Sequence, residues 1–192
     1  MGIRSLLAKP FAAYIDKQTK AWSSRPGETQ LRVFKSLIEG GKSTLFGKEH
    51  GFDSIRSYPD FKNQVPVRDY EALKPYIEKV IEGQPDILWP GKPAYFAKTS
   101  GTTSGTKYIP ISKESAPTHF TAARNATLAY VHETGRASFL DGNLIFLSGS
   151  PELEEVNGIK TGRLSGIRRF YCLSGFTACR WVITAVEQWY VL

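Results

Sequence analysis

The sequence predicts a protein of the α/β class, with a helical start followed by a mixed sheet that has flanking helices. Apolar residues recur at helical spacing in the first part of the chain. Two strand-like runs on either side of a polar loop come next, and a long helix and a third strand-like run follow them. The 192 residues are 41% hydrophobic, which is enough for one domain with an apolar core.

Two amphipathic helices are expected first. The helix from Gly2 to Trp22 contains Pro10, which should kink or divide it. The helix from about Glu28 to Glu39 should end at the Gly40-Gly41 pair. The following Lys42-Ser43-Thr44 resembles the end of a Walker A loop, but that loop follows a strand and needs glycine where this chain has Ser36. We therefore interpret the glycines as a helix stop.

A further helix is expected after Asp69, whose carboxylate can cap it. Its expected buried side contains Leu73, Tyr76, Ile77, Val80 and Ile81. Pro75 predicts a bend or a late start, and Gly83 an end. The lone His50 between these helices is interpreted as a structural or surface residue instead of a catalytic base.

The character of the chain changes after Leu88, where strand patterns begin. Ala94–Lys98 and Tyr108–Ile111 are expected to form strands. Ser112 should cap a long helix that reaches about His132, and Leu144–Leu147 should form another strand. The polar loop between the first two strands is therefore held at both ends by sheet.

This loop contains hydroxyl residues, two glycines and a final lysine: Thr99, Ser100, Gly101, Thr102, Thr103, Ser104, Gly105, Thr106 and Lys107. Glycines let backbone N–H groups approach a ligand, hydroxyls add hydrogen-bond donors, and lysine adds positive charge. These residue types favour a phosphate-binding loop. A flexible Ser/Thr/Gly turn is the alternative that composition leaves open.

The order of residues resembles the phosphate-binding signature of the adenylate-forming superfamily, which includes luciferases and acyl-CoA synthetases. That signature reads Ser/Thr-Ser-Gly-Ser/Thr-Thr/Ser-Gly, two residues, then Lys. This chain matches it at Thr99, Ser100, Gly101, Thr102, Thr103 and Lys107. Ser104 stands where the signature has its next glycine, and Gly105 follows one place later.

The wider sequence is similar to the Gretchen Hagen three (auxin-responsive promoter) branch, and its pattern most resembles that of bacterial-type members. The resemblance covers roughly Met1 to Ile167. Its further segments are Phe46-Gly47-Lys48, Val65-Pro66-Val67, Trp89–Pro93, Tyr108–Ile111, Leu147–Ser150 and Thr161–Gly166.

The resemblance implies an acyl-acid amido synthetase, which uses ATP and Mg²⁺ to activate a carboxylic acid as an acyl-adenylate. An amine or amino acid then takes the acyl group. It implies phosphate contacts from the loop residues Thr99, Ser100, Gly101, Thr102, Thr103, Ser104, Gly105 and Lys107, with Lys98 a weaker candidate. Catalytic residues and metal ligands stay unassigned. Glu152, Glu154 and Glu155 could suggest magnesium, but we interpret them as a solvated loop.

The charge pattern gives no reason to expect nucleic acid as a partner. The net charge is +7, but the cations are spread along the chain instead of forming a run. No apolar run reaches the roughly 18 to 20 residues that a membrane span needs. We expect a cytoplasmic protein with small-molecule partners. His119 and His132, in the helix after the loop, are interpreted as surface or packing residues, although either could line an acyl pocket.

Two segments are predicted: residues 1–167, the N-terminal portion of an adenylate-forming large domain, and residues 168–192, an atypical tail. The tail contains both cysteines and shows no family pattern, which suggests an out-of-frame or truncated end. A native alternative is an element that covers an exposed sheet edge. Family members are much longer, so an incomplete fragment with weak or no turnover of its own is expected. The alternative function is a non-catalytic nucleotide- or protein-binding remnant.

Overall fold

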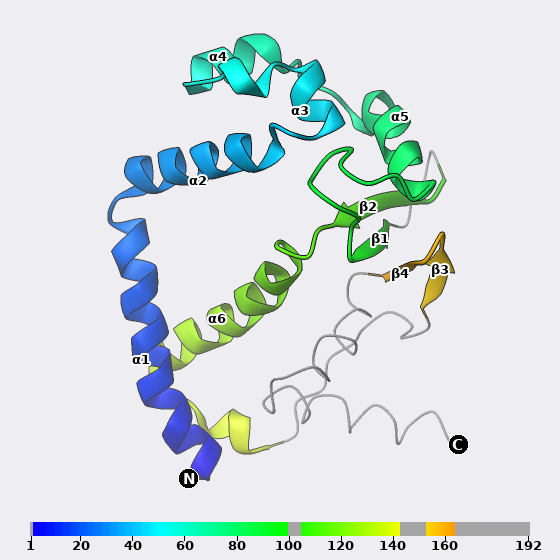
Figure 1. Cartoon of the computed structure of the whole chain (residues 1–192). Coiled ribbons are helices and arrows are strands. Elements are labelled where there is room, and N and C mark those ends of the chain that lie inside the picture. Colours follow the sequence, from blue (N-terminus) through cyan, green and yellow to red (C-terminus); the bar gives the residue numbers. More distant parts are fainter. Residues whose placement is uncertain (1, 100–104, 143–152, 164–192) are drawn as a thin grey trace, which may run out of the picture. The chain divides into compact units, whose positions relative to one another are not determined.

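The computed structural model describes residues 2–99, 105–142 and 153–163 (Figure 1). The chain divides into two compact units. The described part of the first unit contains residues 2–24, 117–142 and 162–163, and that of the second contains residues 25–116 and 153–161. The predicted strand Leu144–Leu147 lies outside the described residues. None of the described helices has both the length and the apolar character that a membrane span needs.

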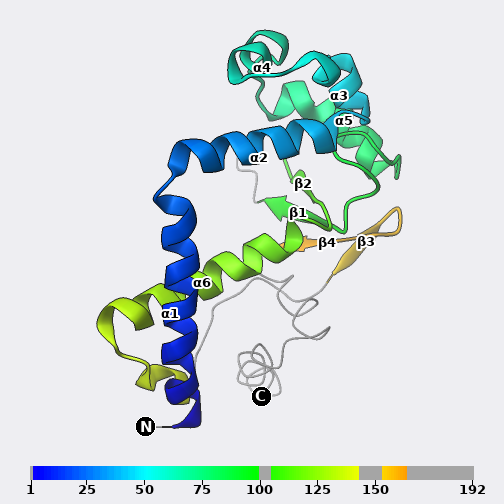
Figure 2. The same cartoon turned by 60° about the vertical axis from the view of Figure 1, so that its left-hand side comes forward.

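The first unit is built around the helices α1 (Ile3–Ser23) and α6 (Ala116–Thr134), with a short 3-10 helix, η2 (Ser138–Asp141). Figure 2 shows α1 lying across α6. Their contact is apolar, because Ala12 packs in one core with Leu128 and Val131. Of the two effects expected at Pro10, a kink or a division, the division does not occur, since α1 continues through that residue.

The second unit begins with a series of helices. They are α2 (Pro26–Gly41), α3 (Leu45–Glu49), the 3-10 helix η1 (Phe52–Ser54), α4 (Tyr58–Gln64) and α5 (Tyr70–Ile81). Side-chain caps explain where several of these helices begin. Ser57 and Asp60 form a capping box at α4, and the Asp69 side chain accepts a 2.8 Å hydrogen bond from the Ala72 N–H at α5, as predicted.

The Walker-like segment is a connection between two helices. Gly41 ends α2, and the buried Thr44 side chain accepts a 3.0 Å hydrogen bond from the Gly47 N–H of α3. Thr44 Oγ1 also donates to the Gly41 carbonyl at 2.7 Å. A Cβ on Gly47 would lie 2.1 Å from the Gly41 carbonyl oxygen, so only glycine fits there. These contacts agree with the interpretation as a helix stop.

His50 has a structural environment, as interpreted from the sequence. It is buried, and its ring stacks on Phe46 with the ring centroids 4.0 Å apart. Its Nδ1 lies 2.7 Å from the Phe46 carbonyl oxygen, and its Nε2 lies 2.7 Å from Nη1 of Arg68. Since the guanidinium can only donate, Nε2 accepts and Nδ1 carries the proton. Both nitrogens are therefore used inside the fold.

The described residues form a sheet of four strands in the order β2-β1-β4-β3. The strands β1 (Tyr95–Thr99) and β2 (Lys107–Ile111) pair antiparallel, and so do β3 (Glu154–Val156) and β4 (Ile159–Arg163). Phe96 of β1 and Ile159 of β4 pack with Val80 and Ile87 in one buried cluster. This cluster joins the sheet to α5.

The β3–β4 hairpin corrects one part of the sequence analysis, which interpreted Glu152, Glu154 and Glu155 as a solvated loop. Glu152 lies outside the described residues, and Glu154 and Glu155 are exposed as interpreted but do not lie in a loop. Glu154 and Glu155 belong to β3, and Asn157-Gly158 makes the turn. Both turn residues have left-handed backbones, with φ of 49° and 79°. Asn-Gly is the pair that favours such a two-residue turn. Because β3 is at the edge of the described sheet, its charged side chains can face solvent.

Candidate functional site

The predicted phosphate-binding loop connects the two strands of the β1–β2 hairpin. The register pairs Thr99 with Lys107 and Lys98 with Tyr108. The loop therefore leaves and re-enters the sheet at the same end of the hairpin. Of the predicted site residues, Thr99, Gly105 and Lys107 are described. Ser100, Gly101, Thr102, Thr103 and Ser104 lie outside the described residues.

Gly105 has a backbone conformation that favours glycine. Its φ is 80°, in the left-handed region, and a Cβ at this position would meet no atom of the described residues within 4 Å. The backbone conformation is thus a sufficient reason for glycine here. The glycine that this chain has one place after the signature position is the residue that turns the loop into β2.

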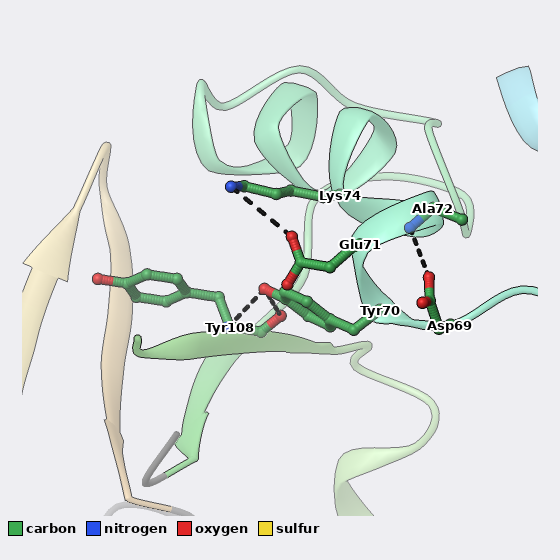
Figure 3. Close-up of polar contacts among 6 residues, drawn as sticks. All are labelled: Asp69, Tyr70, Glu71, Ala72, Lys74 and Tyr108. Atoms are coloured by element: carbon green, nitrogen blue, oxygen red, sulfur yellow. Dashed lines mark hydrogen bonds and ion pairs between the residues drawn. The ribbon is translucent and has the colours of Figure 1, made fainter. Parts of the chain in front are cut away.

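Lys107 lies at the loop exit next to Tyr70 of α5. The Lys107 Nζ is 5.2 Å from the centre of the Tyr70 ring, within the range of a cation–π contact. The Tyr70 hydroxyl accepts a 2.9 Å hydrogen bond from the Tyr108 N–H and lies 3.4 Å from the Tyr108 carbonyl oxygen, to which it donates (Figure 3). The sequence analysis did not single out Tyr70.

Lys98, the weaker candidate, lies at the loop entrance and is already paired. Its ammonium group forms an ion pair with the Glu154 carboxylate of β3 and lies 5.9 Å from the centre of the Tyr108 ring. The described ends of the loop therefore carry two cations, of which Lys107 contacts an uncharged ring and Lys98 a carboxylate. Lys107 is the better placed of the two to attract an anion.

A magnesium site is not assigned from the described residues. Among them, one group of side chains lies close enough together to hold a metal ion, and it consists of Asp16, His132 and Glu133. The Asp16 carboxylate already lies 2.8 Å from the Lys20 ammonium and 3.2 Å from His132 Nε2. The positive charge of Lys20 beside this carboxylate would repel a metal cation. His132 thus has a packing partner, and His119 is exposed.

Comparison with curated proteins finds plant relatives. Jasmonoyl–L-amino acid synthetase JAR4 of Nicotiana attenuata is 23% identical over 139 residues, which are 71% of this chain and 24% of that protein. Indole-3-acetic acid-amido synthetase GH3.15 of Arabidopsis thaliana is 32% identical over 103 residues, or 52% of this chain and 17% of that protein. The chain thus spans about a quarter or less of their lengths. These plant relatives do not support the expectation of a bacterial-type member.

Comparison with solved structures establishes the fold. A structure of GH3.15 acyl acid amido synthetase matches with a TM-score of 0.71 at 18% identity, covering 85% of this chain and 29% of that chain. A second, of AtGH3.15 acyl acid amido synthetase in complex with 2,4-DB, matches with a TM-score of 0.62 at 20% identity. The predicted architecture, a helical start followed by a mixed sheet with flanking helices, is confirmed as part of the fold of these structures.

The family model described as the GH3 (Gretchen Hagen three) family N-terminal domain matches residues 16–189. This interval contains the hairpin and also most of segment 168–192, in which the sequence analysis found no family pattern. The boundary at residue 168 and the origin of the tail stay predictions. The match covers most of the 192 residues, and the chain therefore belongs to the GH3 family.

Proposed function

We propose that the loop between Thr99 and Lys107 binds the β- and γ-phosphates of Mg-ATP in an acyl-acid amido synthetase. The observation that carries the proposal is the register of the hairpin, which places Thr99 opposite Lys107 at the two ends of a loop of glycine and hydroxyl residues. The left-handed Gly105 and the Lys107 ammonium at the loop exit add support. Membership of the GH3 family adds the reaction class.

In the proposed reaction a carboxylate oxygen attacks the α-phosphorus of ATP. A new O–P bond forms, the bond to the bridging oxygen breaks, and pyrophosphate leaves with the electron pair. Backbone N–H groups and hydroxyls of the loop donate hydrogen bonds to the leaving group, and Lys107 offsets its growing negative charge. An amine then attacks the acyl carbonyl carbon, AMP leaves, and the amine nitrogen loses a proton.

The names of the relatives support a substrate class, since they are a jasmonoyl–L-amino acid synthetase and an indole-3-acetic acid-amido synthetase. One solved neighbour carries 2,4-DB, another small carboxylic acid. We infer that this chain belongs to an enzyme that joins a small carboxylic acid to an amine or amino acid. Because the chain spans about a quarter or less of the relatives' length, turnover by this chain alone is tested separately below. A cytoplasmic location stays a prediction.

The test combines ATP binding with pyrophosphate exchange. Isothermal titration calorimetry with the purified chain should detect ATP binding, and a Ser100/Thr102/Thr103 triple alanine variant should weaken it at least about tenfold, since several hydrogen bonds of roughly 1 kcal/mol each are lost. A matched control replaces Thr118, Thr121 and Thr127 of α6 by alanine, which removes three hydroxyls elsewhere. This control should bind ATP like the original chain.

Carboxylate-dependent ATP–pyrophosphate exchange then separates two functions. Exchange by the purified chain indicates adenylation, whereas binding without exchange indicates a nucleotide-binding remnant that lacks the chemistry. Undiminished ATP affinity in the triple variant, with the melting temperature of the control, would contradict the proposed site.

A further inference from the structure

We propose that Tyr70 is a positioning residue that holds the Lys107 ammonium group at the exit of the loop. The inference rests on the proposed function, because it concerns how the phosphate-binding lysine is placed. Tyr70 belongs to α5, and Lys107 is the first residue of β2. Two separate contacts join them, one through the phenol hydroxyl and one through the ring.

The hydroxyl contact fixes the backbone immediately after Lys107. The Tyr108 N–H donates a 2.9 Å hydrogen bond to the Tyr70 hydroxyl, and this hydroxyl donates a 3.4 Å hydrogen bond to the Tyr108 carbonyl oxygen. Because β2 is at the edge of the described sheet, these two backbone groups point away from β1 and have no partner strand. The phenol takes the place of that strand at one residue. It therefore limits the movement of the loop exit.

The ring contact acts on the side chain of Lys107. Its Nζ lies 5.2 Å from the centre of the Tyr70 ring, and both side chains are half-buried. The negative face of an aromatic ring attracts an ammonium group without neutralising its charge. Lys98 differs in this respect, because the Glu154 carboxylate pairs with it. Tyr70 thus orients Lys107 and leaves its full charge available to an anion.

The position of Tyr70 is itself well defined. It is the first residue of α5, directly after the Asp69 cap, whose carboxylate accepts from the Ala72 N–H at 2.8 Å (Figure 3). Further along α5, Ile77 and Val80 are buried, and Val80 packs with Phe96 of β1. The helix that carries Tyr70 is thereby fixed to the hairpin that it positions. An ammonium group held in place before ATP arrives loses less side-chain entropy on binding.

The inference predicts a selective effect on the phosphate end of the nucleotide. Tyr70→Phe removes the hydroxyl contact and should weaken ATP binding about threefold, and Tyr70→Leu also removes the ring and should weaken it about tenfold. AMP, which lacks the β- and γ-phosphates, should bind both variants as it binds the original chain. Isothermal titration calorimetry with ATP and AMP measures all of these affinities.

Tyr76→Phe is the matched control. Tyr76 is on the same helix, is also half-buried, and its hydroxyl donates to the Glu49 carboxylate instead of the hairpin. Its loss should leave ATP affinity within about twofold, below a typical hydrogen-bond contribution. A general loosening of α5 would affect Tyr76→Phe and Tyr70→Phe alike, which would overturn the inference. Melting temperatures show whether Tyr70→Leu stays folded. If Tyr70→Leu does not fold, the ATP affinity of Tyr70→Phe alone tests the inference.

Lys107→Ala separates the inference from the function on which it rests. If Tyr70 acts through Lys107, Tyr70→Leu combined with Lys107→Ala should bind ATP no more than about twofold worse than Lys107→Ala alone. Two results would refute the positioning role and leave the proposed function intact. In the first, the losses of ATP affinity from Tyr70→Leu and Lys107→Ala multiply in the double variant; in the second, Lys107→Ala binds ATP more weakly while the Tyr70 variants bind it as the original chain does. Unchanged affinity in both Lys107→Ala and the loop triple variant would instead refute the proposed function.

Discussion

Replacement of Gly105 by alanine tests the loop exit through its backbone alone. The residue has a φ of 80°, and a Cβ there would meet no atom within 4 Å in the part of the chain that the structure describes. No clash adds to the conformational penalty, which is about 1–2 kcal/mol for a residue with a Cβ in the left-handed region. Alanine recovers part of this, about 0.4–1 kcal/mol, by restricting the unfolded chain. We expect Gly105→Ala to destabilise the protein by roughly 1 kcal/mol, or about 2–4 °C in Tm.

Gly158→Ala provides a control in the same sheet. Gly158 has a φ of 79° and lies in the β3–β4 turn, and a Cβ there would likewise meet none of the described atoms within 4 Å. Thermal unfolding should therefore show similar losses for the two variants. Calorimetry with ATP should separate them, with affinity reduced about threefold or more in Gly105→Ala and unchanged in Gly158→Ala, since a strained residue readjusts the loop only at position 105.

Two results would refute this reasoning. A Gly105→Ala variant with a raised Tm would show that the left-handed backbone is not required at this position. Equal destabilisation of the two variants, with ATP affinity intact in both, would show that the conformation at Gly105 has no part in binding.

Further predictions concern the sheet around the loop. Phe96→Ala should lower the free energy of unfolding by about 3–5 kcal/mol, because Phe96 is fully buried, and a loss below about 1 kcal/mol in urea denaturation would contradict this core. Burial raises the pKa of Tyr95 from 10.0 to about 12, so the folded state keeps a proton that the unfolded state loses. The stabilisation from the protonated Tyr95 is complete below pH 10 and is lost as the pH rises to about 12, at up to about 1.4 kcal/mol per pH unit. Tyr95→Phe should therefore make the free energy of unfolding fall less steeply with pH in this range, and an unchanged slope would contradict the raised pKa. Glu154→Gln should alter stability by less than about 1 kcal/mol, as expected for an exposed ion pair, and should raise ATP affinity by freeing Lys98; weaker ATP binding would contradict this.

The elements whose signals lie within a few residues could be predicted from sequence. Asp69 predicts the start of α5 because a cap and the N–H that it accepts are three residues apart. The arms of the β1–β2 hairpin were predicted to within about one residue, since strand-forming residues flank a polar loop. The Asn157-Gly158 turn carried an equally local signal, but the acidic residues before it were interpreted as evidence for a solvated loop.

The partners of the site residues could not be predicted in the same way. Tyr70 contacts Tyr108 across 38 positions, and Lys98 pairs with Glu154 across 56. Such contacts depend on the packing of α5 and on the order of the strands, which no local pattern contains. The phosphate-binding role of Ser100–Ser104 stays a prediction from the motif, which the binding experiments test.

Nuclear magnetic resonance of the amide-labelled chain tests the central claim most directly, because it observes the backbone N–H groups of the loop themselves. ATP and pyrophosphate should shift the Gly101 and Gly105 amide resonances in a saturable way, whereas AMP should leave them in place. Saturable ATP binding that leaves both glycine amides unmoved would contradict the account, because the triphosphate would then be bound elsewhere.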